Sequence, residues 1–570
     1  MKNLELARIF NDIADMLEIK EDRFRVQAYR RAARAMEALT EDVAEVAARD
    51  RLMDISGIGK GLAEKIIEYL KTGQMKYYDE LRASLPRGVL TLMQVPEIGP
   101  KTALLLHEKL GIESIDDLEK ACKEGRVRTL PRMGARTEEN IVKGIELIRR
   151  TRERLPLGAV LPHAREILER LGHLKAVQQA STAGSIRRMR ETIGDIDVLV
   201  TSTDPEAVME TFTTLPAVQR VLSKGTTRSS VVLDVGIQAD VRVVEPEAFG
   251  AALQYFTGSK EHNIKVRERA VRRGLKINEY GVFRIEDDAR VAGRTEEDVY
   301  RAIALPWIPP EIREDQGEVE LAERGKLPRL IKREDIRGDL HVHTRWSDGA
   351  DSAEEMVKAA KARGYEYVAI TDHSQGLKFA GGVTIEDLRE HAQVARRLGD
   401  RHGIAVLMGC EVDILPDGSL DYPDDVLEEL DVVVASVHSR FRMGAAEMTR
   451  RIIRAMESPH VDIIGHMTGR LLGSRDPYAV EIEALLEAAA RIGTVIEINA
   501  TPERLDIKDT YARMARERGV KLAINTDAHS RHQLRYTEFG VGTARRGWVE
   551  PGDVINALPV KKLEAFLDER

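Results

Sequence analysis

The sequence predicts a multidomain protein of mixed α+β and α/β class. We expect a helical N-terminal region, a central mixed sheet and a C-terminal seven-stranded β/α barrel. The 570 residues are too many for a single hydrophobic core. Apolar residues recur at helical spacing near the N-terminus, for example over residues 6–19 and 24–39. After residue 336, short apolar segments alternate with amphipathic ones, which is typical of a parallel sheet with covering helices.

Composition and charge limit the class of protein and its partners. With 43% hydrophobic and 32% charged residues, the chain is of the ordinary globular type. Cys122 and Cys410 imply no disulfide framework, and no segment approaches the ~18 apolar residues of a membrane span. We therefore expect a cytoplasmic protein with no membrane partner. The net charge is −8, but residues 121–190 hold 16 basic and 7 acidic side chains. This basic stripe favours a phosphate-rich partner, with a solvated helix face as the alternative.

Two segments of the helical region resemble each other, and a third is a weaker copy. Residues 55–70 and 95–110 each pass through a glycine-rich turn into an amphipathic helix, as residues 130–145 do more loosely. Such glycines allow backbone N–H groups at the start of the second helix to approach an anion. A plain helix connection is the alternative, but the repetition favours contact with a DNA backbone. The segments resemble helix-hairpin-helix motifs, and the predicted DNA-binding glycines are Gly57, Gly59 and Gly99.

The central region carries two acids in an unusual place. A helix at 162–171 precedes three predicted strands, and Asp195 and Asp197 lie on the same face of the first of them. An exposed edge strand with solvated acids is the plain alternative. With Asp240 on another strand, however, three carboxylates can hold two Mg²⁺ or Mn²⁺ ions, which would remove the repulsion between the acids. The three acids therefore predict a catalytic site for nucleotidyl transfer.

Further motifs lie around these acids. The turn at Gly184 and Ser185, with Arg188 nearby, suits a polyphosphate. Residues 255–270 read YFTGSKEHNIKVRERA. Together with the Gly-Ser turn and the three acids, this segment resembles the family X DNA polymerases, of the DNA polymerase beta type, over residues 1–310.

That resemblance implies roles for individual residues. The three acids would be the metal-binding catalytic groups, and dNTPs would be the substrates. The residues implied to bind the nucleotide and the template side are Gly184, Ser185, Arg188, Tyr255, Phe256, Gly258, Asn263 and Arg267. Of these, Tyr255, Phe256 and Gly258 would line the sugar pocket. Core packing is the alternative for the two aromatic residues.

The N-terminal helices also resemble the lyase domain of this family. Lys65 falls where the Schiff-base lysine lies, so it is a candidate catalytic residue. Gly61 and Arg25 stand where neighbouring lysines are expected. Phosphate binding is therefore the alternative for Lys65.

Ten of the 14 histidines lie between residues 341 and 532, near the ends of predicted barrel strands. The chemistry of a barrel gathers at the carboxyl ends of its strands. The candidate metal ligands are His341, His343, Asp348, His373, Glu411, His438, His466, Asp527 and His529. Imidazoles and carboxylates suit two or three Mn²⁺, Zn²⁺ or Fe²⁺ ions, with water or hydroxide attacking a phosphate ester. Asp348 and Asp372 each have the further alternatives of supporting a ligand or capping a helix.

This C-terminal half resembles the PHP (polymerase and histidinol phosphatase) domain over residues 336–570. The resemblance implies 3′–5′ exonuclease and related phosphoesterase activities. A linker rich in Pro, Gly and mixed charge precedes the half. The expected segments are 1–85 (helical, lyase-like), 86–154 (second helix-hairpin-helix region), 155–245 (palm), 246–315 (nucleotide selection), 316–335 (linker) and 336–570 (PHP domain).

The combined expectation is a DNA polymerase that fills gaps during repair, including base excision repair, with a 3′ nuclease in the same chain. Gapped or primer-template DNA and dNTPs would be its partners, and we expect a monomer. Three alternatives remain: a nuclease that only binds DNA with its polymerase-like half, a nontemplated nucleotidyltransferase and a small-molecule phosphatase. The three acids weigh against the first, the YFTGS segment and the hairpins against the second, and the DNA-binding half against the third.

Overall fold

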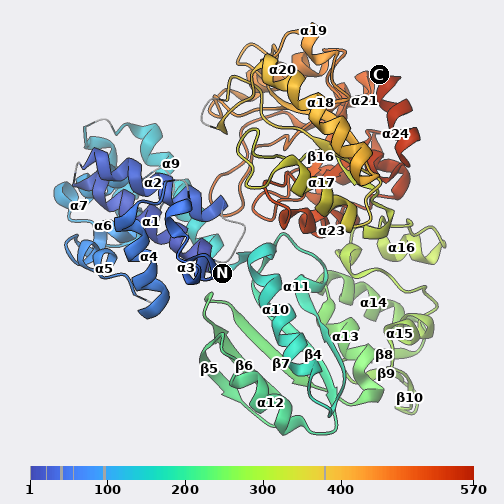
Figure 1. Ribbon diagram of the computed structural model, residues 1–570. Helices are drawn as coiled ribbons and strands as arrows, with labels where there is room; N and C mark the ends of the chain where they lie inside the picture. Colours follow the sequence, from blue (N-terminus) through green and yellow to red (C-terminus); the bar gives the residue numbers. More distant parts are fainter. Residues whose placement is uncertain are drawn as a thin grey trace. The chain divides into compact units, whose positions relative to one another are not determined.

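The computed structural model describes residues 2–569 except 21, 39–42, 56, 73, 94, 96–97, 132 and 378–379. The chain divides into two compact units, an N-terminal unit of residues 2–152 and a C-terminal unit that holds nearly all of residues 153–569 (Figure 1). Within the described residues, no helix combines the length and apolar character that crossing a membrane requires.

The N-terminal unit is helical, as predicted. Its elements are α1 (Lys2–Ile19), α2 (Arg23–Ala38), α3 (Val43–Ala48), η1 (Leu52–Asp54), α4 (Lys60–Thr72), α5 (Lys76–Ala83), α6 (Arg87–Leu92), α7 (Pro100–Leu110), α8 (Ile115–Lys123), η2 (Val127–Thr129) and α9 (Ala135–Glu153). Two separate hydrophobic cores stabilise it, one running from Leu6 to Leu81 and the other from Val89 to Ile145. Each of the three glycine-rich turns leads into a helix, namely α4, α7 and α9.

A five-stranded sheet opens the C-terminal unit, with the strand order β2-β4-β7-β6-β5. The elements of this part are β1 (Leu155–Pro156), α10 (Leu157–Gly172), β2 (Val177–Thr182), α11 (Gly184–Arg187), β3 (Thr192–Ile193), β4 (Asp195–Ser202), α12 (Pro205–Thr213), β5 (Val218–Lys224), β6 (Arg228–Leu233) and β7 (Gln238–Val243). Strands β4 and β7 are parallel, and the other pairs of this sheet are antiparallel, so the predicted mixed sheet is confirmed. Helix α10 begins earlier than the predicted 162–171, because buried Leu157 and Val160 pack into the core of the sheet.

Smaller helices and a three-stranded sheet follow. Their elements are η3 (Pro246–Ala248), α13 (Phe249–Thr257), α14 (Lys260–Arg272), β8 (Leu275–Asn278), β9 (Gly281–Arg284), β10 (Arg290–Ala292), α15 (Glu296–Ala302), η4 (Pro310–Ile312), α16 (Glu318–Glu323) and η5 (Arg333–Asp335). The segment 316–335, which composition indicates as a linker, is packed rather than solvated. Glu318 of α16 is fully buried and lies 2.7 Å from the ring of His262, and Leu330 and Ile331 are buried in hydrophobic cores.

The remaining chain forms the predicted seven-stranded parallel barrel, which is nearly closed. Its strands, neighbours in sequence order, are β11 (Gly338–Asp339), β12 (Tyr367–Ile370), β13 (Ala405–Asp413), β14 (Val432–Ser436), β15 (Ile463–Ile464), β16 (Val495–Asn499) and β17 (Leu522–Asn525). Its helices are α17 (Ala353–Ala362), α18 (Ile385–His402), α19 (Asp424–Leu427), α20 (Ala445–Met456), α21 (Ile482–Ile492), α22 (Asp509–Glu517), η7 (Gln533–Tyr536), α23 (Thr537–Arg546), η8 (Pro551–Asp553), η9 (Ile555–Ala557) and α24 (Val560–Asp568). A parallel bridge between Val342 and Ala528 brings the first and last strands together.

The barrel and the five-stranded sheet share a hydrophobic core. Leu505 and Phe539, both from the barrel region, are buried within the core of the sheet. Trp548 is buried among residues of the segment between sheet and barrel. The C-terminal unit is therefore a continuous packed body.

Candidate catalytic sites

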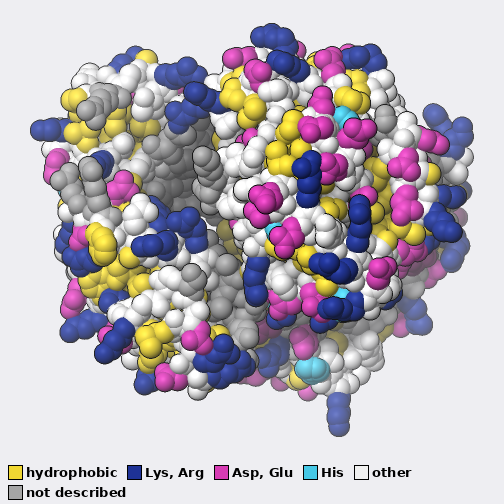
Figure 2. Space-filling view, turned by 45° about the horizontal axis from the view of Figure 1, so that its top comes forward, with side chains coloured by type: hydrophobic (Ala, Val, Ile, Leu, Met, Phe, Trp, Pro, Cys, Tyr) yellow, Lys and Arg dark blue, Asp and Glu magenta, His cyan; other side chains and the backbone are white. Residues whose placement is uncertain are grey.

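The nine predicted barrel ligands converge on one place. The carboxyl ends of parallel barrel strands lie on the same face, and six of the seven strands carry a predicted ligand at or just after this end. Most of these side chains are buried, and little histidine surface is visible on the face of the molecule in Figure 2. The strands thus bring together imidazoles and carboxylates that are far apart in the chain; His341 and Glu497, for example, are 156 positions apart.

The converging side chains form three sets with metal-ligand geometry. In each set the donor atoms all lie within 4.8 Å of one another. The sets are His343, Asp348, His373 and His529; then His341, His343 and Asp527; then His373, Glu411 and His438. His343 and His373 each belong to two sets, so the three sets adjoin one another.

Glu411 lies at the centre of the cluster. Its carboxylate oxygens are 2.9 Å from His373 Nδ1, 2.9 Å from His466 Nε2 and 3.3 Å from His438 Nε2. His466 is in none of the three sets, but it contacts Glu411, which belongs to one of them.

The donors fit a cation. Several buried polar atoms of the cluster have no hydrogen-bond partner among the described residues, namely His341 Nε2, both ring nitrogens of His343, His373 Nδ1, Glu411 Oε2 and His466 Nδ1. An unsatisfied buried polar atom costs about 1–3 kcal/mol, and metal coordination would satisfy the carboxylate oxygen and one nitrogen of each neutral ring. Mixed imidazole and carboxylate donors suit Mn²⁺, Zn²⁺ or Fe²⁺.

The candidate ligand rings differ in their protonation states. Burial, with His529 and His373 nearby, lowers the pKa of His343 to about 4, which keeps its ring neutral at neutral pH. Burial disfavours protonated His373, but the Glu411 and Asp348 carboxylates outweigh it and raise the pKa of His373 to about 10. A cation that bound His373 would displace this proton.

Two supporting acids were missed by the sequence reasoning. Glu497 accepts from His341 Nδ1 at 2.7 Å, and Asp413 lies 2.9 Å from His438 Nδ1. Such contacts fix the orientation of a ligating ring. Glu497 is a lone acid within the apolar segment of strand β16, and this position in the sequence could have indicated its role. Asp372 accepts instead from Thr344 and Ser347, and these hydrogen bonds hold the loop after β11.

The three acids of the central sheet lie on its two parallel strands. Asp197 on β4 is directly opposite Asp240 on β7, and Asp195 is two residues before Asp197 on the same face. Burial, then Asp195 and Asp240, raises the pKa of Asp197 to about 6. The oxygens of these three acids do not form a set within 4.8 Å, because like charges repel and Ser230 and Gln238 hold Asp240. A bound cation would remove this repulsion.

The Gly-Ser turn lies against these acids. Gly184 has a φ of +60°, and a Cβ there would lie 2.8 Å from Asp197 Oδ2, so both conformation and space require glycine. Ser185 Oγ is buried without a hydrogen-bond partner among the described residues. Arg188 donates to the carbonyl of Thr257 and, at 3.0 Å, to Glu314. The arginine therefore connects the turn to the YFTG segment.

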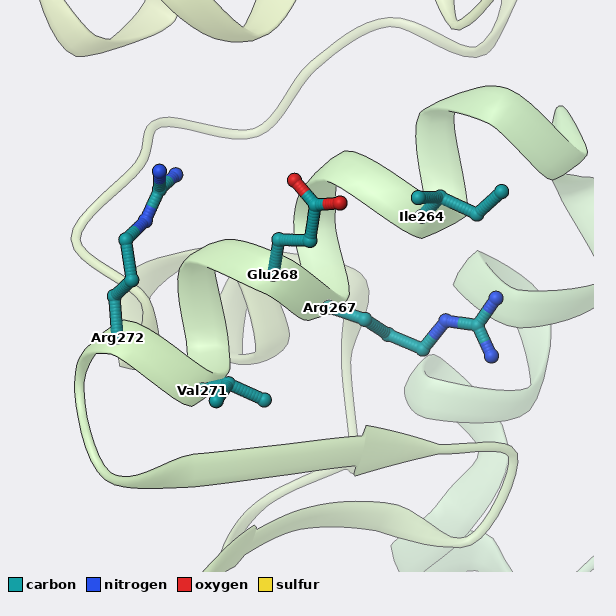
Figure 3. A pocket seen from close by; sticks show the side chains of 5 residues that line it. All are labelled: Ile264, Arg267, Glu268, Val271 and Arg272. Atoms are coloured by element: carbon teal, nitrogen blue, oxygen red, sulfur yellow. The ribbon is translucent and has the colours of Figure 1, made fainter.

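The YFTG segment ends α13 and is followed by α14. Tyr255 and Phe256 make an edge-on contact with ring centroids 5.2 Å apart. Asn263 is tied to Gln254 and to the Tyr255 carbonyl, both at 2.7 Å. Arg267 projects from α14 into a hollow of about 510 Å³, between Ile264 and Val271 (Figure 3). The predicted base-contacting and template-side residues thus lie on one helix.

The predicted DNA-binding glycines of the N-terminal unit have open space beside them. A Cβ at Gly59 or Gly99 would meet no protein atom within 4 Å, and neither has a positive φ. The protein itself therefore does not require glycine at these positions, whereas close approach of a ligand would. Gly57 differs, since its φ of +88° requires glycine for the turn.

Lys65 lies in a cluster of polar and aromatic side chains in the same unit. Its Nζ is 5.1 Å from the ring centroid of Tyr77, and Arg25 donates to the Tyr77 hydroxyl at 3.1 Å. Arg25 and Tyr77 line a pocket of about 360 Å³. Lys20 lines this pocket too, as do the acids Asp22 and Glu80, so its lining carries both charges.

Together these sites define a class: an enzyme that joins a nucleotidyltransferase sheet to a metal-binding phosphoesterase barrel. Comparison with known proteins agrees with that class. Family models match a helix-hairpin-helix domain at 1–75, a SAM-like helix-hairpin-helix tandem at 89–146, a DNA polymerase beta thumb at 252–314 and a PHP domain at 339–501.

Two curated relatives show how far the similarity extends. The DNA polymerase/3′-5′ exonuclease PolX of Bacillus subtilis is 41% identical over 100% of this chain and 99% of the relative. A probable phosphatase of a Thermoanaerobacter species is 30% identical over 41% of this chain and 94% of the relative. The chain belongs to the family X DNA polymerases that carry a C-terminal PHP domain. It is therefore a DNA polymerase with a phosphoesterase domain, and both families depend on metal ions.

Proposed function

We propose that this protein fills gaps in DNA during repair, including base excision repair, and trims 3′ ends with its barrel. The observation that carries the proposal is the pairing of Asp197 with Asp240 beside the Gly-Ser turn, in a chain that also gathers three metal-ligand sets. Gapped or primer-template DNA and dNTPs would be the substrates. We further propose a monomer acting in the cytoplasm, with the domain boundaries expected from the sequence except that residues 316–335 are a packed segment and not a linker.

In the polymerase site, Asp195, Asp197 and Asp240 would hold two Mg²⁺ or Mn²⁺ ions. These ions would acidify the attacking 3′ hydroxyl and offset charge on the triphosphate. Ser185 and Arg188 would hold the triphosphate, and the Gly184 backbone would let it approach closely. Tyr255, Phe256 and Gly258 would line the sugar pocket, with Asn263 at the base and Arg267 at the template. Lys65 is a candidate lyase nucleophile.

In the barrel, the nine ligand residues would hold two or three Mn²⁺, Zn²⁺ or Fe²⁺ ions. Such ions supply a hydroxide nucleophile and polarise the phosphate ester. Glu497 and Asp413 would orient His341 and His438 through their ring nitrogens. The relatives named probable phosphatases favour a second activity, hydrolysis of phosphate monoesters at DNA ends.

Extension of a gapped primer tests the proposal. Purified full-length protein is mixed with a 5′-labelled primer in a one-nucleotide or five-nucleotide gap, with Mg²⁺ or Mn²⁺ and all four dNTPs. Filling of both gaps is expected. Untemplated addition of any nucleotide would instead indicate a nontemplated transferase.

Replacing Gly99 with valine should weaken DNA binding without destabilising the fold. Its φ of −73° suits valine, and the added carbons would enter open space where a phosphate would lie. We expect the Kd for gapped DNA to rise about three- to tenfold, as for one lost helix-terminus contact. Gly111→Val is the control at the other end of α7, where the φ of +65° predicts a lower Tm and unchanged affinity of the folded protein. An unchanged Kd for Gly99→Val would contradict the assigned role.

Replacing Gly258 with alanine should impair nucleotide use more than DNA binding. A Cβ there would lie 3.2 Å from Arg188 Nη1, and the φ of +69° would be strained. Displacement of this arginine should lower kcat/KM for dNTPs by about tenfold or more. Gly236→Ala controls for strain alone, since its φ is +82° and its Cβ would meet nothing within 4 Å. Steady-state kinetics and DNA titration measure both quantities, and equal losses in the two variants would refute the role of Gly258.

A further inference from the structure

The turn after α11 is held by side chains of the barrel region. Arg546 at the end of α23 donates to the carbonyl of Arg188 at 2.9 Å. Met189 follows in the left-handed region, with a φ of +51°, a conformation that needs tertiary support. Its side chain packs so closely on Gly542 of α23 that a Cβ there would lie 2.6 Å from Met189 Cε. Two successive residues of the turn therefore contact α23.

A single carboxylate joins this turn to α23. Glu314, which is 12% exposed, lies 3.0 Å from Arg188 Nε and 2.9 Å from Arg546 Nη1. Arg190 lies 3.5 Å from its other oxygen. Burial raises the pKa of Glu314, but Arg188 and Arg546 outweigh it and hold this pKa below its usual value. The carboxylate is thus an ionised group beside the arginine that would bind a triphosphate.

Arg546 is itself anchored in the barrel. Its Nε and Nη2 lie 2.8 Å and 2.7 Å from Asp509 Oδ2 at the start of α22. A guanidinium is planar, so fixing one edge sets the direction of the other. The free edge reaches Glu314 and the Arg188 carbonyl, and the side chain is only 6% exposed. The barrel thereby fixes the position of the Arg546 guanidinium next to the turn.

We infer that Arg546 is a positioning residue for the triphosphate site of the polymerase, although it belongs to the phosphoesterase half of the chain. The inference rests on the proposed role of Arg188 in holding the triphosphate. Arg546 offsets the charge of Glu314, which otherwise attracts Arg188 more strongly and repels the incoming polyphosphate. It also holds the Arg188 backbone in place. Both effects make nucleotide binding depend on the barrel.

The test measures dNTP kinetics of full-length variants on gapped DNA. Arg546→Met should raise the KM for dNTPs about tenfold, which is a usual size for the energetic coupling between two sites. The Kd for DNA and the rate of 3′ degradation should stay near their wild-type values. In the double variant Arg546→Met with Glu314→Gln, the KM for dNTPs should return toward the wild-type value. The negative charge of Glu314, which Arg546 no longer offsets, is absent from this variant. A general loss of stability would not be rescued in this way.

Arg165→Ala is the matched control. Arg165 on α10 pairs with Glu538 on α23, so this variant removes another contact between the sheet and α23 away from the turn. Its KM for dNTPs should stay within about twofold of wild type. If Arg546→Met does not fold, Arg546→Lys is measured in its place, because lysine cannot contact both Asp509 and Glu314 as the guanidinium does. An unchanged KM in Arg546→Lys would overturn the inference.

Arg188→Ala separates the inference from the function on which it rests. If Arg188→Ala raises the KM and Arg546→Met does not, the positioning role is wrong and the role of Arg188 stands. If Arg188→Ala leaves the KM unchanged, both assignments fail.

Discussion

Asp197→Ala should lower primer extension by about a thousandfold or more and leave 3′ degradation near the wild-type rate. Asp197 lies opposite Asp240 and two residues after Asp195, so its carboxylate is the one that both other acids approach. Metal-mediated charge stabilisation contributes several kcal/mol, and about 1.4 kcal/mol corresponds to a tenfold change in rate. The barrel cluster draws on other residues and should be unaffected.

Both activities are measured on one preparation, with a labelled primer in a gap, with dNTPs for extension and without them for degradation. Asp234→Ala is the control, because Asp234 is an exposed acid at the turn between β6 and β7 of the same sheet. Extension by Asp197→Ala at a rate close to that of Asp234→Ala would show that the acids are not the catalytic group.

His343→Ala should abolish most 3′ degradation and reduce the bound metal, while primer extension persists. His343 belongs to two of the three ligand sets, and its Nε2 is 3.2 Å from Asp527 and 3.5 Å from Glu411. Its ring is neutral at neutral pH, as a ligand must be. Loss of this residue, which two ligand sets share, should lower the rate of 3′ degradation about a hundredfold or more.

Metal content is read by elemental analysis of protein purified without added metal, alongside both activities. His173→Ala is the control, since this exposed histidine lies at the end of α10, outside the ligand sets. Retained degradation with unchanged metal in His343→Ala would contradict the assignment of the barrel cluster.

Helices and strands could be predicted from the sequence where a local residue pattern is enough to determine them. The alternation of apolar and amphipathic segments predicts all seven barrel strands, and the acids at 195 and 197 mark β4. Eight of the nine predicted barrel ligands lie at or shortly after the end of an apolar strand, whereas Asp348 lies in the loop between β11 and α17. His466 is the one predicted ligand outside the three sets, although it contacts Glu411.

Contacts between distant segments could not be predicted in this way. Nothing in the sequence near Arg546 indicates that it reaches Arg188, 358 positions away. The segment 316–335 has the composition of a linker because Glu318 looks like a solvated charge. Its contact with buried His262 and the burial of Leu330 and Ile331 show otherwise. A charge pattern in sequence does not distinguish a buried ion pair from an exposed one.

A single assay tests the central claim that one chain holds two separate metal-dependent sites acting on the same DNA end. Wild-type protein, Asp197→Ala and His343→Ala are each incubated with a gapped duplex that carries a mismatched 3′ terminus, with dNTPs and Mn²⁺. Wild type should remove the mismatch and fill the gap, Asp197→Ala should only shorten the primer, and His343→Ala should leave the mismatched terminus in place. Extension by His343→Ala is also read on the same duplex with a matched terminus, and loss of both activities in either single variant would show that the two sites are not independent.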